Sequence, residues 1–167
     1  EHHIDALGAD TKVLLWPSPF CPDDAAYEKV LNWVSAGGRL LVTGDLSLNW
    51  DRKRTRQRRL EELCGVEFVR EVYLPPNRDA QPGQGLRGLP EDWQAKPCVA
   101  VRSAGATELV TTETGDPVVF TNQVGAGMVY YCTDPLELGA PDAVYNALMG
   151  DSVGTVVSAR PEVLLKN

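Results

Sequence analysis

One stretch of sequence decides the fold, residues 12–45, and it reads KVLLWPSPFCPDDAAYEKVLNWVSAGGRLLVTGD. Lys12–Trp16 and Arg39–Gly44 are short, almost fully apolar runs, which is typical of strands that are covered on both faces. Between them, apolar residues follow helical spacing after an N-cap at Asp23. A strand, a helix and a strand in this order form a βαβ unit, and the handedness rule for such units makes the two strands parallel.

The pattern changes farther along the chain. Helical spacing predicts a helix over Thr55–Cys64, and alternation predicts a half-exposed strand over Val66–Leu74. Residues 75–97 hold five prolines, which predicts a long irregular excursion. Four hairpin-like strands are expected after it: Cys98–Arg102, Glu108–Thr112, Pro117–Thr121 and Met128–Cys132. A last helix begins at Pro141, and short tail strands are expected at 155–157 and 163–165.

These elements predict a single α/β domain over residues 1–167. We expect a three-layer, flavodoxin-like or Rossmann-like architecture, with a mostly parallel central sheet and an added antiparallel hairpin region. A doubly wound sheet usually has a βα unit before such a first strand, and none precedes Lys12. We therefore expect the chain to be a fragment of a longer polypeptide.

Composition limits the possible functions. Sixteen basic and 23 acidic residues give a net charge of −7, which repels phosphate backbones and argues against nucleic acid as a partner. No apolar run approaches the ~20 residues that would cross a bilayer. The four cysteines are widely spaced, without a CxxC pair. We expect free thiols, no metal or cofactor, and a reducing, cytoplasmic compartment.

Candidate site residues follow two of the predicted strands. Ligands gather outside the carboxyl ends of strands in open α/β sheets, and these ends run into Asp45 and into Asp134 and Glu137. Three carboxylates there could do acid–base work or hold a cation. The favoured interpretation is that they cap turns. The chain's two histidines, His2 and His3, stand at its N-terminal end, far from both strands.

A basic segment offers a second candidate. Residues 51–59 carry six basic side chains in nine positions. They could contact an acidic partner, a phosphate or an anionic sugar. The favoured alternative is a solvated helix face whose arginines pair with acidic residues of this chain. The candidate contact residues in this segment are Arg52, Arg54, Arg56 and Arg58.

The four tryptophans fall into two groups. Trp16 and Trp33 lie in core-type elements, so they are expected to pack in the interior. Trp50 and Trp93 lie in loops beside polar residues. Because loop tryptophans are enriched at interfaces, we favour docking against a neighbouring domain over stacking on a sugar ring.

Three blocks of sequence, in this order, resemble one known family. They are VLLWPSPFCPDDAAYEKVLNWVSAGGRLLVTGD, RLEELCGVEF and DPVVFTNQVGAGMVYYCTDPLEL. They are similar to the class I glutamine amidotransferase-like domain, and most of all to the version that forms the trimerisation domain of bacterial β-galactosidases of glycoside hydrolase family forty-two and related enzymes. The resemblance covers roughly residues 10–70 and 115–150.

The resemblance implies a domain that has lost its catalytic groups. Active amidotransferases place a nucleophilic Cys at the elbow that aligns near Asp45, and a His-x-Glu pair where this chain has Thr133-Asp134-Pro135. In the β-galactosidases a separate barrel domain hydrolyses the glycoside. The resemblance therefore implies a parent glycoside hydrolase, with partners in the rest of the polypeptide and in other subunits, as a homotrimer.

The sequence thus predicts a non-catalytic accessory and oligomerisation domain of a larger, β-galactosidase-like carbohydrate-active enzyme. Two alternatives remain open. One is a hydrolase or amidotransferase with a relocated nucleophile, at Cys21 or Ser47. The other is a module that binds an anionic glycan or small molecule through the arginine-rich segment.

Overall fold

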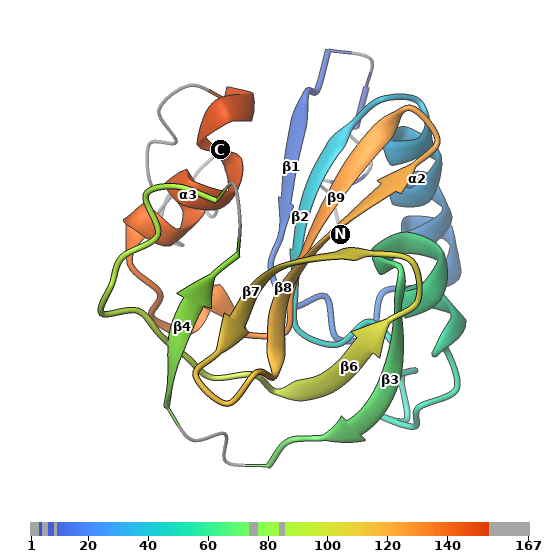
Figure 1. The fold of residues 1–167 in the computed structure, drawn as a ribbon. Helices are drawn as coiled ribbons and strands as arrows, with labels where there is room; N and C mark the ends of the chain where they lie inside the picture. Colours follow the sequence, from blue (N-terminus) through green and yellow to red (C-terminus); the bar gives the residue numbers. More distant parts are fainter. Residues whose placement is uncertain (1–3, 5–6, 9, 74–76, 84–85, 154–167) are drawn as a thin grey trace.

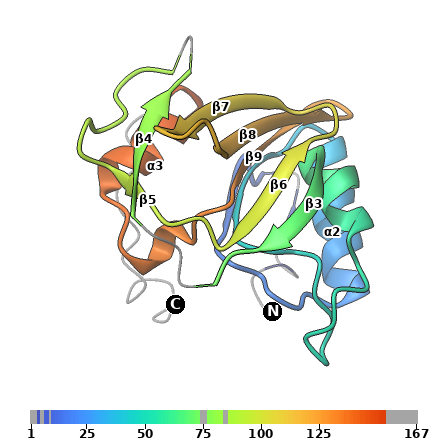
Figure 2. The ribbon, with the colours of Figure 1, turned by 60° about the horizontal axis from the view of Figure 1, so that its bottom comes forward.

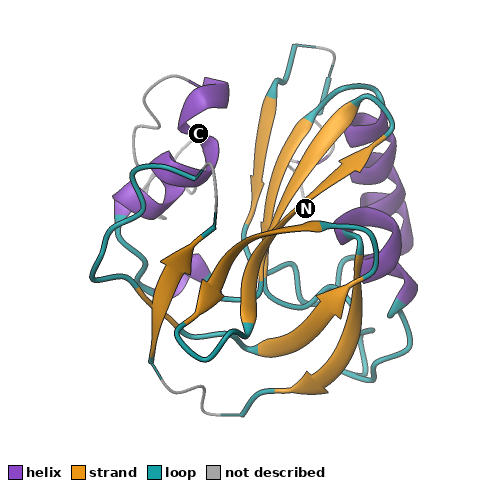
Figure 3. Cartoon of the chain, viewed as in Figure 1, coloured by secondary structure: helices purple, strands orange, loops and turns teal. Residues whose placement is uncertain are grey.

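The structure is a computed structural model, and it describes residues 4, 7–8, 10–73, 77–83 and 86–153. Figures 1 and 3 show a curled sheet with one long helix on either side of it. The elements in chain order are β1 (Val13–Trp16), α2 (Asp24–Ser35), β2 (Arg39–Thr43), η1 (Leu60–Cys64), β3 (Val66–Glu71), β4 (Arg78–Pro82), β5 (Gln94–Ala95), β6 (Val99–Ser103), β7 (Thr107–Thr112), β8 (Pro117–Val124), β9 (Gly127–Cys132), η2 (Leu136–Leu138) and α3 (Asp142–Val153).

The predicted βαβ unit is confirmed. β1 pairs in parallel with β2, with Val13 beside Arg39, and β2 pairs in parallel with β9, with Arg39 beside Met128. α2 joins β1 to β2, and its N-cap is Asp23, as predicted: the side chain accepts a hydrogen bond from the Ala26 N–H (2.6 Å). This bond satisfies one of the amide groups that a helix leaves free at its first turn.

The C-terminal end of α2 packs directly against the turn between β8 and β9. The Ala126 N–H donates to the Ser35 carbonyl oxygen (3.0 Å). A Cβ on Gly127 would lie 2.0 Å from the Val34 carbonyl oxygen, so this position excludes any side chain. The close approach holds the helix against the predicted turn at residues 125–127.

The central sheet is largely antiparallel, which corrects the prediction of a mostly parallel, three-layer flavodoxin-like sheet. Its strand order is β1-β2-β9-β8-β7-β4-β5, and within it β9 to β5 pair antiparallel. Turns at Gly115 (φ 85°) and Gly125 (φ 59°) join β7, β8 and β9 as hairpins. Hairpins leave no place for the crossover helices that a parallel sheet needs. The result is a mixed α/β fold with a curled seven-stranded sheet.

A second sheet of two strands lies beside the first. β3 pairs antiparallel with β6, with Phe68 beside Val101. Figure 2 shows this pair across from β7 and β8. The strand predicted over Val66–Leu74 is thus present as β3, although its partner belongs to the stretch expected to form hairpins.

Two other predicted segments differ from the structure. The helix expected over Thr55–Cys64 begins later, and its last part is η1, a short π-helical turn that ends at Gly65 in the left-handed conformation (φ 67°). The irregular excursion over residues 75–97 contains β4 and β5, which extend the central sheet beyond β7. The tail strands expected at 155–157 and 163–165 lie outside the described residues.

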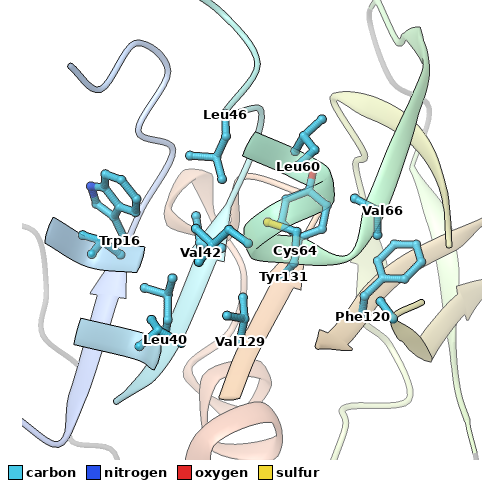
Figure 4. Packing of buried hydrophobic residues seen from close by; sticks show 14 of the residues in the cluster. Trp16, Leu40, Val42, Leu46, Leu60, Cys64, Val66, Phe120, Val129 and Tyr131 are labelled. Carbon is cyan, nitrogen blue, oxygen red and sulfur yellow. The ribbon is translucent and has the colours of Figure 1, made fainter. Parts of the chain in front are cut away.

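Two apolar clusters fill the two faces of the sheet. Alternation along β2 divides them, since Leu40 and Val42 point into the first cluster and Leu41 into the second. The first cluster packs α2, η1 and β3 against the sheet, and Figure 4 shows it around Phe120 and Tyr131, whose ring centroids lie 6.1 Å apart. The second cluster packs α3 against the opposite face.

Candidate functional site

The carboxyl ends of β1, β2 and β9 meet at one edge of the sheet, where hydrogen bonds join the segments that follow them. The Ser18 N–H donates to Thr43 Oγ1 (2.9 Å), and the Thr43 hydroxyl donates to Glu137 Oε2 (2.9 Å). Ser18 follows β1, Thr43 ends β2, and Glu137 lies in η2, after β9. We call this region the carboxyl edge. Ser18, Thr43 and Glu137 thus form hydrogen bonds with one another at this edge.

Asp45 follows β2 at this edge and is fully engaged by its own chain. The residue is 5% exposed. Its Oδ1 accepts hydrogen bonds from the Ser47 N–H (2.9 Å) and the Ser47 hydroxyl (2.6 Å), and its Oδ2 pairs with Arg54 Nη2 (2.7 Å). The carboxylate therefore shapes the turn after β2, as the favoured interpretation predicts.

Asp134 follows β9 and binds a neighbouring segment. Its Oδ2 accepts a hydrogen bond from the Lys96 N–H (2.9 Å), which attaches the stretch before β6 to the edge. Burial raises the pKa of the Asp134 carboxyl, while the Lys96 N–H and the Lys96 charge oppose the rise. Asp45, Asp134 and Glu137 thus lie at the same edge, but each has a separate protein partner.

A cysteine that the sequence analysis did not single out lies among these carboxylates. Burial, and then the charges of Asp45, Asp134 and Glu137, raise the pKa of the Cys98 thiol to about 12. Cys98 stands before β6, and its N–H donates to the Thr133 carbonyl oxygen (2.9 Å). A thiol with so high a pKa is almost entirely protonated at neutral pH, so it is a poor nucleophile.

The two relocated nucleophiles considered from the sequence are also bound internally. The Cys21 thiol donates to the Asn49 carbonyl oxygen (3.0 Å). Ser47 is fully buried, and its hydroxyl donates to Asp45. Nucleophilic serines need an adjacent base and access to substrate, and a buried hydroxyl has no such access. His2 and His3 lie outside the described residues.

Arg54 bridges two acidic residues from different elements. Its Nη2 lies 2.7 Å from Asp45 Oδ2, and its Nη1 lies 2.7 Å from Glu71 Oε1, at the end of β3. The guanidinium also stacks over the Phe68 ring, 4.0 Å from its centroid. This arrangement ties the loop after β2 to the two-stranded sheet.

Two of the other four arginines in residues 51–59 bind the N-terminal end of α2 and the residue before its N-cap. Arg56 and Arg59 both donate to the Pro22 carbonyl oxygen (2.9 and 2.7 Å) and pair with Asp24. Arg59 is buried, and its guanidinium lies over the Tyr27 ring. The sequence analysis did not name it, because its partners are distant in the chain. The expected ion pairing within the chain is present, but Arg54 and Arg59 are largely buried and do not form the expected solvated helix face.

Arg58 and Arg52 differ from this group. Arg58 is exposed and makes an exposed ion pair with Glu62 (3.3 Å), one helical turn away. Arg52 is exposed and has a φ of 57°, at the tip of a turn in which its N–H donates to the Asn49 carbonyl oxygen (2.8 Å). Trp50 stands at the same tip and is 67% exposed.

Three exposed apolar side chains lie in the segments that follow the strands of the carboxyl edge. Phe20, Trp50 and Leu138 come after β1, β2 and β9 respectively, and all three are exposed. The bond between Cys21 and Asn49 holds the first two loops together. Trp93 differs from the expectation, because it is 2% exposed and packs inside the second cluster. It is therefore removed from the candidate interface.

Among the described residues, no group of three His, Cys, Asp or Glu side chains is placed to hold a metal ion. In the same residues no helix has the length and apolar character needed to cross a membrane.

Comparison with known proteins gives structural neighbours but no sequence match. No protein-family model matches the chain, and no curated protein matches it. A β-galactosidase from Bacillus circulans sp. alkalophilus is 19% identical, with a TM-score of 0.67 over 84% of this chain. A GH42 β-galactosidase from G. stearothermophilus is also 19% identical, with a TM-score of 0.58 over 72% of this chain.

These likenesses establish a shared fold. The chain spans about a fifth of the length of both β-galactosidases, 22% and 18% of their chains. A cytoplasmic protein from Salmonella typhimurium LT2 is 18% identical, with a TM-score of 0.61, and the match covers 74% of that chain. The fold thus occurs both as a small part of β-galactosidase chains and as most of a shorter protein.

Proposed function

We propose that this chain is a non-catalytic accessory domain that assembles a larger carbohydrate-active enzyme, related to β-galactosidases. The proposal rests on one observation: the polar groups of the carboxyl edge are bound to one another. Asp45 is held by Ser47 and Arg54, and Glu137 is held by Thr43. The Cys98 thiol, which has a pKa of about 12, is protonated at neutral pH.

The family resemblance gives the proposal its direction. An amidotransferase-like layer with Asp45 in place of the nucleophile has lost glutaminase chemistry, and its solved structural neighbours include β-galactosidases. The catalytic barrel of the parent would lie elsewhere in the same polypeptide. Subunits would associate as a homotrimer, and the exposed apolar residues of the carboxyl edge are the candidate contact surface.

The first test is genetic context and assembly. The gene around this coding sequence should encode a glycoside hydrolase domain in the same polypeptide. In that parent enzyme, Trp50→Ser should weaken subunit association by about 2 kcal/mol, roughly thirtyfold, because exposed tryptophans at interfaces often dominate the binding energy. Size-exclusion chromatography with light scattering over a dilution series measures this.

The control is Val69→Ser, which removes an apolar side chain that is 52% exposed within β3, outside the segments that follow β1, β2 and β9. It should leave association unchanged. Equal association of wild type and Trp50→Ser would contradict the assembly surface. A gene without a hydrolase domain, or saturable glutaminase or esterase turnover by the purified chain, would contradict the function itself.

A further inference from the structure

A cleft beside the two-stranded sheet is lined by an arginine that makes no ion pair among the described residues. The cleft has a volume of about 110 Å³ and lies between the two-stranded sheet and the ends of β4, β7 and β8. Figure 2 shows β3 and β6 on one side of this region and β7 and β8 on the other. Arg70 of β3 and Arg78 of β4 both line it.

The two arginines differ in their partners. Arg78 pairs with Glu113 (3.3 Å), and both side chains are partly exposed. Arg70 makes no ion pair among the described residues. Most arginines of this acidic chain form ion pairs within the chain. An exposed guanidinium that lines a cleft and has no such partner can form charge-assisted hydrogen bonds with a bound anion.

The walls of the cleft are apolar and small. Ala100 stands directly opposite Arg70 in the β3–β6 ladder, and residues in register share one face of a sheet. Ala100 has only a methyl side chain, and Val72 and Pro117 also line the cleft. The cleft volume of about 110 Å³ is smaller than the roughly 150 Å³ of a cavity that binds benzene. The apolar part of a ligand must therefore be compact.

The remaining charge at the cleft limits the charge of the ligand. Asp116 also lines it, and its carboxylate accepts a hydrogen bond from the Thr114 hydroxyl (2.8 Å). A dianion would be repelled by Asp116, whereas a single carboxylate can face Arg70 with its apolar part against Ala100. We propose that this cleft binds a monocarboxylate attached to a compact branched aliphatic group. This chemistry occurs in short branched acids and at peptide C-termini that end in leucine or valine.

The test is a titration of the chain followed by two-dimensional NMR of backbone amides, at constant ionic strength. The probes are 3-methylbutanoate, N-acetyl-leucine, the neutral 3-methylbutanamide and inorganic phosphate. Either carboxylate should give saturable shifts at residues 70–72 and 99–101, and neither the amide nor phosphate should. A lower dissociation constant for N-acetyl-leucine than for 3-methylbutanoate would indicate that the ligand is a peptide C-terminus. The reverse order would indicate a free branched acid.

The matched variants are Arg70→Gln and Arg102→Gln. Arg102 is exposed on neighbouring β6, pairs with Glu67 and does not line the cleft. Arg70→Gln should weaken carboxylate binding at least about tenfold, since it removes a charge-assisted contact, and Arg102→Gln should leave binding unchanged. Absence of saturable shifts, equal binding by Arg70→Gln, or equal binding of phosphate would overturn the proposal. None of these outcomes bears on the proposed assembly function.

Discussion

The carboxyl edge and the cleft beside the two-stranded sheet use their charges in opposite ways. At the edge, Asp45 and Glu137 have internal partners, while apolar side chains such as Trp50 are exposed. In the cleft the apolar groups form the walls, while Arg70 has no ion pair among the described residues.

This difference bears on which of the two regions could bind a charged ligand. A charge that already has a buried partner gives little to a ligand, because the internal pair must be broken first. Under the proposed function, the region where ligands gather in open α/β sheets would therefore stabilise the fold and present exposed apolar side chains. Arg70, which has no ion pair among the described residues, lies instead on β3 of the two-stranded sheet.

The largest effect that sharpens this contrast concerns Cys98. A pKa of about 12, against an ordinary value of 9.0, lowers the thiolate fraction at pH 8 about a thousandfold relative to a free cysteine. Alkylation by iodoacetamide, followed by mass spectrometry of the Cys98 peptide, should be slower than that of glutathione by at least that factor. Rapid alkylation in the folded chain would mean that the edge retains a reactive nucleophile.

The next effect concerns the bridge made by Arg54. Arg54→Met leaves Asp45 buried without its cation, which should lower the free energy of unfolding by about 3 kcal/mol. Arg58→Met is the control, because its exposed pair with Glu62 should contribute less than about 0.5 kcal/mol. Urea denaturation of both variants measures the difference. Similar losses of unfolding free energy in the two variants would show that the Arg54 ion pairs stabilise the fold no more than an exposed surface pair does.

The parts of the fold that depend on local sequence were predictable. Asp23 as N-cap and the apolar runs around α2 lie within one stretch, so spacing alone predicts that unit. The position of the antiparallel strands β7, β8 and β9 in the sheet depends on a distant pairing, that of β9 with β2. Short strands carry no local signal that distinguishes a separate hairpin from one that continues a parallel sheet.

The site was predictable in position but not in its partners. The strand ends indicate Asp45 and Asp134, and both lie where parallel strands place them. The partners of Arg54 include Glu71, and Cys98 meets the edge through Thr133; both contacts join distant segments of the chain. The loop position of Trp93 suggests exposure, but it packs in the second apolar cluster with Ala80 of β4 and Ala95 of β5, in a segment that was expected to be irregular.

The smallest expected effect concerns the contribution of the Asp134 carboxyl to the stability of the fold. Burial raises the pKa of Asp134 in the folded chain above its ordinary value of 3.8, while the unfolded carboxyl titrates near that value. Between the two values the folded state binds more protons, so the free energy of unfolding falls as pH rises through this window. Asp134→Asn removes the titration and keeps an oxygen that can accept from the Lys96 N–H.

Wild type and Asp134→Asn should therefore differ least below pH 3.8, where the carboxyl is protonated in both the folded and the unfolded state. The variant should gain stability relative to wild type as pH rises above that value. Thermal unfolding at a series of pH values, with Asp116→Asn as an exposed control, measures the gap. A gap that narrows with rising pH would mean that the negative charge of Asp134 stabilises the fold. The carboxylate would then have a favourable interaction in the folded chain beyond the Lys96 amide, and burial would not be the dominant influence on its pKa.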